Sequence, residues 1–272
     1  MIYTLIILGI VLYFIRFYIY KIENFNNKYN LVIGSCFKNE AHILDEWIAH
    51  YKYHGIDHIY LINDNSNDNY KEVLAPYIKD GYVTLFENTL KIDSYPRQKF
   101  LYEKYFKPII NNSTWWMIID LDEFMYSPGE INLKNAIKPY NDYGLIFIKW
   151  KMFGSNGHIN QPKYVVPSFT KRKYDNSELN GKSIINSKLL NNFDVHLHDT
   201  KGNSIYVENI IINHYAIQSW SFFQKVKMTR GDVNNYVQNN NIIRDKKYFD
   251  EYDYNEIDDF ILFEQNKSLY KT

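Results

Sequence analysis

The sequence predicts an α/β protein with a mainly parallel central sheet that is flanked by helices. Three observations favour this class. From Leu31 onward, short apolar runs alternate with segments of helical periodicity. Glycines stand where two of the helical segments should end, at Gly55 and Gly81. With 272 residues, 46% of them hydrophobic, the chain can form one substantial core or a core with a smaller appendage.

Each element of this pattern follows from a local signal. The predicted strands are the apolar runs at residues 31–37, 56–64, 82–87, 115–119 and 143–150. The predicted helices cover residues 39–55, 70–81 and 97–110, and a later one runs from 219 to about 230. In the first helix Ile43, Leu44 and Trp47 recur at helical spacing. The segment from Asn234 onward is predicted to be an acidic, partly helical tail that closes the fold.

The first 30 residues differ from the rest. Residues 2–15 carry no charge, and Arg16 follows. This run is shorter than the ~20 residues that cross a bilayer, but a snorkelling arginine would extend the span to Lys21. We therefore predict a membrane anchor at residues 1–21, a linker at 22–30 and one domain at 31–272, which makes the protein membrane-associated with a single pass. A signal-peptide core and a docked helix are the alternatives, and the side of the membrane is left open.

Composition excludes several classes of function. Lys+Arg and Asp+Glu both number 31, so no overall charge attracts nucleic acid, and we expect no nucleic-acid partner. The single cysteine, Cys36, excludes an internal disulfide framework and a cysteine zinc cluster. No GxGxxG or Walker-type loop is present, so a bound nucleotide would not be held by a glycine-rich loop.

Polar, mostly acidic residues follow three of the predicted strands. Glu40 comes after the first strand, Asp64 ends the second, and Asp120, Asp122 and Glu123 follow the fourth. Ligands of open α/β sheets bind beyond the carboxyl ends of the strands. The sequence therefore predicts a binding site at this edge of the sheet.

Asp120 and Asp122 are separated by one residue. In extended chain, residues i and i+2 point to the same side, so both carboxylates could converge on one cation. Oxygen ligands suit Mg²⁺ or Mn²⁺, which can neutralise a diphosphate leaving group. A solvated turn after a strand is the alternative reading of so short a motif.

The motifs around these carboxylates resemble those of glycosyltransferase family 92, which is related to the family-2 enzymes with the GT-A fold. The resemblance rests on "CFKNEAHILDEWIAHYKYHGIDHIYLINDNSND", "RQKF", "WWMIIDLDEF", "WKMFGSNGH" and "INHYAIQSWSFFQKVKMTRGD", in this order, between Leu31 and Asp232. It implies a Rossmann-like GT-A fold, a nucleotide-sugar donor of the UDP-linked kind, a divalent cation (Mn²⁺ or Mg²⁺) and a glycan or glycoprotein acceptor.

Carried over residue by residue, the resemblance assigns roles to individual side chains. Donor binding falls to Glu40, Asp64, Arg97, Gln98, Asp120 and Lys225, with Ser219 and Arg230 also facing the diphosphate. The metal ligands are Asp120, Asp122 and His196, with His198 and His214 as alternatives for the histidine. Trp150, Phe153 and Gly154 belong to a loop expected to face the sugar or the acceptor, although core packing is the alternative for both aromatic rings. Glu123 points away from the aspartate pair and is expected to orient it.

The predicted function is metal-dependent transfer of a sugar from a nucleotide sugar to a hydroxyl, with inversion. Inversion needs a carboxylate base near that hydroxyl, and the candidates are Asp175, Glu178, Asp194 and Asp199. A non-catalytic carbohydrate- or nucleotide-sugar-binding protein is one alternative. A metal-dependent phosphohydrolase with an aspartyl nucleophile is another, but it would need the Asp-x-Asp motif after the first strand.

Overall fold

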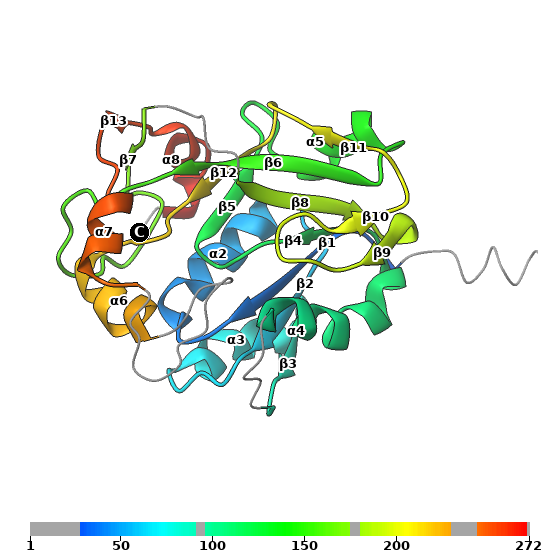
Figure 1. The fold of residues 1–272 in the computed structure, drawn as a ribbon, viewed down its shortest axis with the longest axis horizontal. Coiled ribbons are helices and arrows are strands. Elements are labelled where there is room, and N and C mark those ends of the chain that lie inside the picture. The colour runs from blue at the N-terminus through cyan, green and yellow to red at the C-terminus, as the bar shows by residue number, and fades with distance from the viewer. Residues whose placement is uncertain (1–27, 91–95, 175–179, 230–243, 271–272) are drawn as a thin grey trace, which may run out of the picture.

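The computed structural model describes residues 28–90, 96–174, 180–229 and 244–270 (Figure 1). The predicted anchor at 1–21 and most of the predicted linker lie outside the described residues. Within the described residues, no helix has the length and apolar character needed to cross a bilayer. The last two linker residues, Tyr29 and Asn30, already belong to the first strand, β1 (Tyr29–Phe37).

A mixed sheet of nine strands runs through the described part of the chain (Figure 1). One half is parallel, in the order β3-β2-β1-β4. Its members are β1, β2 (His58–Asn63), β3 (Val83–Glu87) and β4 (Ser113–Ile118). The first four predicted strands are therefore confirmed, together with their parallel pairing.

The second half of the sheet mixes both directions. Its strands are β5 (Glu123–Tyr126), β6 (Leu145–Met152), β8 (Gly181–Asn186), β11 (Ser204–Tyr206) and β12 (Ile211–His214). The predicted fifth strand is β6, but β6 is not the neighbour of β4. Strand β8, which was not predicted, lies between them and runs antiparallel to both. Strand β12 pairs in parallel with β6 and antiparallel with β5.

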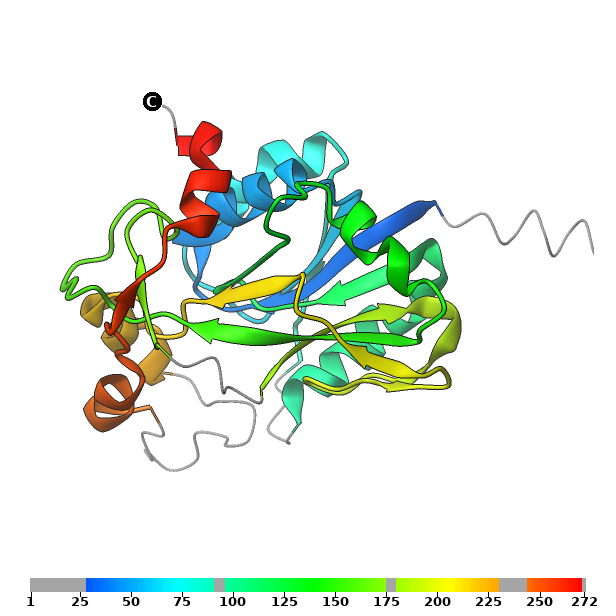
Figure 2. The same cartoon turned by 90° about the horizontal axis from the view of Figure 1, so that it is seen from above.

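Helices cover both faces of the parallel half (Figure 2). Helices α2 (Ala41–Tyr53) and α3 (Tyr70–Lys79) lie on one face, and α4 (Arg97–Tyr105) lies on the other. Successive residues of β4 point to the two cores: Met117 packs with the α2 side and Trp116 with Leu101 of α4. Because both faces are buried, the strand reads as an uninterrupted apolar run.

The predicted helix at 97–110 is interrupted. Helix α4 ends at Tyr105, and the chain continues as a 3₁₀ turn, η1 (Lys107–Asn112). Pro108 lies at the start of this turn and cannot donate a backbone hydrogen bond to the preceding helix. The other short elements are α5 (Leu133–Ile137), η2 (Lys138–Tyr140), β7 (Lys171–Arg172), η3 (Ser187–Leu189), β9 (Leu190–Asn192), β10 (Asp199–Thr200), α6 (Trp220–Lys225) and η4 (Lys227–Thr229).

The C-terminal segment closes the fold, as predicted for its described part. It comprises α7 (Lys246–Tyr252), β13 (Ile257–Asp258), α8 (Ile261–Gln265) and η5 (Lys267–Tyr270), and β13 pairs with β7. Asn266 is fully buried and fastens this segment to α2. Its side-chain amide lies 2.8 Å from ring nitrogens of both His50 and His54.

We expect Asn266→Ala to lower the free energy of unfolding by about 2–4 kcal/mol, because it leaves two buried imidazole nitrogens without partners. Urea denaturation measures this change. Asn141→Ala, at an exposed position, is the matched control and should change the free energy by less than about 0.5 kcal/mol. Equal effects of the two variants would contradict the role of Asn266.

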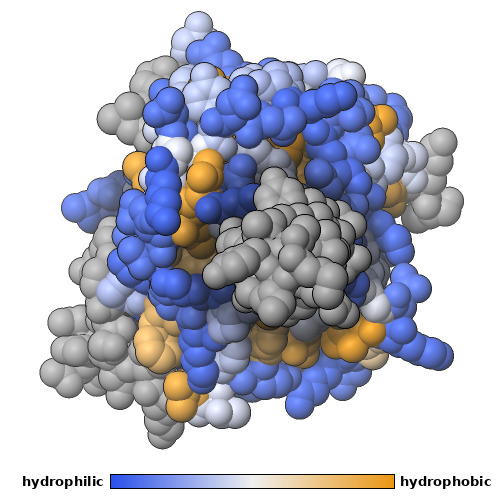
Figure 3. All heavy atoms as spheres, turned by 90° about the vertical axis from the view of Figure 1, so that its right-hand side faces the viewer, coloured by the Kyte–Doolittle hydropathy of each residue, from blue (hydrophilic) through white to orange (hydrophobic). Residues whose placement is uncertain are grey.

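Figure 3 looks at the end of the molecule where the chain enters β1. Most of its visible surface is hydrophilic, and the apolar patches between are small. The carboxyl ends of the parallel strands lie at the opposite end, and the acidic residues predicted as a site gather there.

Candidate functional site

The chain turns sharply between β4 and β5, and this turn presents the acidic residues. The Glu123 N–H donates to the Asp120 carbonyl oxygen at 3.2 Å. The extended geometry expected for residues 120–122 is therefore wrong. Strand β5 has to reverse direction so that it can pair with β12, and the two aspartates consequently face different partners.

Asp120 is held by two side chains. Gln98 Nε2 donates to its Oδ1 at 3.0 Å, and Lys182 Nζ lies 2.8 Å from its Oδ2. The Lys182 side chain comes from β8 and is fully buried. Burial alone would raise the pKa of Asp120, but the Lys182 ammonium outweighs it, and the pKa lies below its usual value. Asp120 is therefore ionised and fixed in place.

Asp122 faces a different lysine. Lys227 Nζ lies 2.5 Å from Asp122 Oδ2 and 3.4 Å from Oε1 of Glu40, which follows β1. Burial opposes ionisation, yet Lys227 and the nearby His214 hold the pKa of Asp122 well below its usual range. One ammonium group therefore joins acids that follow two different strands.

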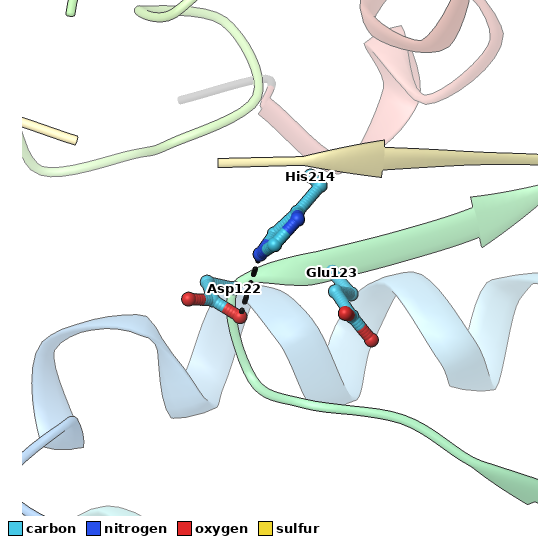
Figure 4. Close-up of side chains that lie close together, drawn as sticks. All are labelled: Asp122, Glu123 and His214. Atoms are coloured by element: carbon cyan, nitrogen blue, oxygen red, sulfur yellow. Dashed lines mark ion pairs between the residues drawn. The ribbon is translucent and has the colours of Figure 1, made fainter. Parts of the chain in front are cut away.

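His214 lies near the second oxygen of Asp122, and Figure 4 shows its ring directed at this carboxylate. The β12–β5 register places His214 directly opposite Glu123. His214 Nε2 is 3.7 Å from Asp122 Oδ1, which is too long for a hydrogen bond. One potential ligand atom from each of Asp122, Glu123 and His214 lies within 4.8 Å of the others. Ligands of one octahedral Mg²⁺ are about 3 to 4.2 Å apart, so these three atoms lie at or slightly beyond the spacing that a hard divalent cation requires.

Only one of the two carboxylate oxygens of Glu123 accepts a hydrogen bond from the described residues. Its Oε2 accepts the Asp120 N–H at 2.9 Å, as expected for a residue that orients the aspartate pair. Its Oε1 is buried and has no hydrogen-bond partner among the described residues. Burial, together with the charges of Asp120 and Asp122, raises the pKa of Glu123 well above its usual value, although Lys182 opposes this. A cation or a proton would satisfy this side chain.

Among the residues that the structure describes, the carboxylates of the cluster outnumber its ammonium groups. Its carboxyl and ammonium groups belong to Glu40, Asp120, Asp122, Glu123, Lys182 and Lys227. When all are ionised, there are two more carboxylates than ammonium groups. Surplus negative charge in a buried cluster is costly, and either a proton on Glu123 or a divalent cation would reduce it.

Trp150 stands beside this cluster between two histidines. Its ring lies 4.4 Å from that of His214 and 5.5 Å from that of His196, measured between ring centroids. Trp150 Nε1, His196 Nδ1 and His214 Nδ1 are buried and have no hydrogen-bond partner among the described residues. Burial and Lys182 lower the pKa of His196 to about 4, so its imidazole is neutral near pH 7.

Two of the predicted donor-binding residues, Asp64 and Arg97, are paired with each other. Arg97 lies 2.5 Å from Asp64 Oδ1, and Asn88 Nδ2 donates to the same oxygen at 2.9 Å. Both residues lie at the carboxyl edge of the sheet, as expected. They can present a carboxylate and a guanidinium to a polar ligand.

The predicted loop after β6 divides into two parts. Trp150 borders the acidic cluster, whereas Phe153 is buried against Tyr215 in the core, with 4.9 Å between ring centroids. Gly154 lies so close to the C-terminal segment that a Cβ would overlap the Tyr254 carbonyl oxygen. Phe153 and Gly154 therefore stabilise the fold rather than face a ligand.

The other predicted site residues are exposed, make local contacts or lie outside the described residues. Lys225 is exposed at the end of α6, and Ser219 caps that helix by accepting the Phe222 N–H. His198 Nδ1 accepts the Asp194 N–H at 3.0 Å, which gives this histidine a structural role. Asp194 and Asp199 are exposed, while Asp175, Glu178 and Arg230 lie outside the described residues.

The sequence analysis did not identify the two buried lysines of the cluster, Lys182 and Lys227. Lys182 is the first residue of the stretch "KSIIN", two residues before its apolar pair, and a charge this close to apolar residues was the available signal. Lys227 is two residues beyond the predicted Lys225, but helix α6 ends before it, and the 3₁₀ turn η4 directs it inward. The register of β12, which favours His214 over His196, has no local signature.

Fold and site together define an α/β protein with an acidic, cation-compatible cluster at the carboxyl edge of its sheet. The model of glycosyltransferase family 92 matches residues 33–263, and the chain belongs to this family. A family 92 protein from Oryza sativa subsp. japonica is 25% identical over 217 residues. One from Ricinus communis is 26% identical over 239 residues.

These relatives are longer proteins. The matches cover 72% and 81% of this chain but only 35% and 40% of the two relatives. A crystal structure of TarS from S. aureus superimposes with a TM-score of 0.42 and 11% identity, over 68% of this chain and 60% of that one.

Proposed function

We propose that the chain transfers a sugar from a nucleoside-diphosphate sugar to an acceptor hydroxyl, on a fold of the GT-A kind. The observation that carries the proposal is the group of buried polar atoms without partners around the acidic cluster of this family 92 chain. They belong to Gln98, Glu123, Trp150, His196 and His214. Unpaired buried donors and acceptors are costly, so they indicate a polar ligand, and a sugar offers hydroxyls of both kinds.

The roles of the residues follow from their contacts. Asp122, His214 and Glu123 would hold the divalent cation, with Asp120 fixed beside them by Gln98 and Lys182. When bound there, Mn²⁺ or Mg²⁺ supplies positive charge that stabilises the diphosphate leaving group. Trp150 offers an indole face and an N–H to the sugar.

In the transfer, the acceptor hydroxyl forms a new bond to the anomeric carbon. The bond from that carbon to the diphosphate oxygen breaks, and its electron pair leaves with the nucleoside diphosphate. The hydroxyl proton passes to a base, which for inversion is a carboxylate of the predicted set. Asp194 and Asp199 are its described members, and both are reachable from solvent.

A release assay tests this function. The full chain is incubated with a panel of UDP- and GDP-sugars, with and without Mn²⁺, and free nucleoside diphosphate is measured. We expect release from at least one donor, and only with the metal. A folded protein that releases no nucleoside diphosphate from any donor, with or without metal, would contradict the proposal.

One observation favours a second candidate, a nucleotide-sugar-binding protein without turnover. Asp120 forms an ion pair with Lys182, and Asp122 forms one with Lys227, so both aspartates already have a cationic partner. This candidate predicts saturable binding of UDP by calorimetry together with no release of nucleoside diphosphate in the assay above.

A further inference from the structure

We propose that Lys227 is an internal counter-cation, which a divalent metal displaces from Asp122 and which then binds the diphosphate of the donor. This inference rests on the proposed function and adds to it an order of binding, with the metal first and the nucleotide second. It concerns a lysine outside the predicted donor-site residues.

Lys227 places its positive charge where a bound metal ion would otherwise neutralise Asp122. Its ammonium group is buried, contacts Asp122 at 2.5 Å and Glu40 at 3.4 Å, and lies 5.8 Å from the centre of the Phe222 ring. All of these partners belong to the site or border it. In this structure, Lys227 therefore neutralises the carboxylate that a cation would need.

A metal on Asp122 would meet Lys227 as a like charge. The free side of Asp122 is Oδ1, which faces His214 at 3.7 Å, and Lys227 occupies Oδ2 of the same carboxylate. A divalent ion between Asp122 and His214 would lie only a few ångströms from the ammonium group. In a buried site such repulsion is poorly screened, so the two cations compete.

Lys227 is the lysine that can move. It extends from the three-residue 3₁₀ turn η4, and its four-carbon stem can carry the ammonium group several ångströms without a backbone change. Lys182, in contrast, extends from β8, which is paired on both sides within the sheet. After displacement, the charge of Lys227 matches that of a diphosphate beside the metal.

Displacement makes metal and nucleotide binding cooperative. The metal releases Lys227 for the diphosphate, and by linkage the nucleotide must strengthen metal binding by the same factor. The coupling factor is the ratio of the UDP affinities with and without Mn²⁺. A general effect of net charge would shift the individual affinities but leave this ratio unchanged.

The test measures the coupling factor by calorimetry on the full chain and on two variants. Lys227→Met should reduce the factor by about tenfold and should bind Mn²⁺ alone more tightly than the unmodified protein. Lys79→Met removes the same charge from an exposed position at the end of α3 and should leave both quantities unchanged. If Lys227→Met does not fold, Lys227→Gln, which keeps an amide donor without the charge, takes its place.

The outcomes separate the inference from the function on which it rests. An unchanged coupling factor in the Lys227 variant, with normal Mn²⁺ and UDP binding in the unmodified protein, would overturn the inference alone. An unmodified protein that binds neither Mn²⁺ nor UDP would overturn both. A reduced factor in Lys227→Met but not in Lys79→Met supports the exchange.

Discussion

Asp122→Asn is expected to lower kcat/KM for sugar transfer by about 10³-fold or more, because it removes a charged metal ligand at the leaving group. The substituted amide keeps the size of the side chain, and Lys227 keeps its contact with Glu40. The fold should therefore persist. The measurement is the rate of nucleoside diphosphate release at saturating Mn²⁺, with thermal unfolding of the same samples.

Asp142→Asn is the matched control, since Asp142 is exposed and has the same chemistry. It should retain full activity. An Asp122→Asn protein that keeps more than about a tenth of the unmodified activity would show that Asp122 is not the ligand on which the reaction depends.

The second large expected effect concerns stability in acid. Burial, with a contribution from Lys182, lowers the pKa of His198 to about 3, compared with 6.5 in the unfolded chain. Below pH 6.5 the unfolded chain takes up a proton that the folded protein does not. His198 therefore contributes full stability above about pH 6.5, and this is lost as the pH falls, by up to about 1.4 kcal/mol per pH unit.

His198→Asn isolates this contribution, because an amide oxygen can still accept the Asp194 N–H and does not titrate. Between pH 6.5 and pH 4.5 the unmodified protein should lose about 2–3 kcal/mol more than the variant. Urea denaturation at pH 7.5, 6.5, 5.5 and 4.5 measures both curves. If the stability curves of the two proteins stay parallel over this range, the protonation of His198 does not differ between the folded and the unfolded protein.

Local patterns were sufficient for the parallel half of the sheet. Strands β1, β2 and β4 are apolar because both of their faces are buried, and the intervening helices carry their own periodicity and glycine stops. Strand β8 could not be predicted in the same way. It is inserted between β4 and β6, and only its long-range partners determine that position.

The candidate site shows the same division. The acids at the strand ends were predictable, since the carboxyl edge of a parallel sheet is fixed by direction alone. Their partners were not. Lys227 depends on where α6 ends, and His214 depends on the pairing of β12 with β5. His198 matched a metal-binding spacing, but its ring nitrogen serves a backbone N–H.

Whether a metal binds Asp122 and displaces Lys227 is best tested with an anomalous difference map from crystals grown with Mn²⁺ and UDP. We expect one manganese peak in contact with Asp122 and His214, with the diphosphate bound to that ion. Lys227 should have moved from Asp122 to a phosphate oxygen. UDP bound with no manganese peak, and with Asp122 still paired to Lys227, would contradict this expectation.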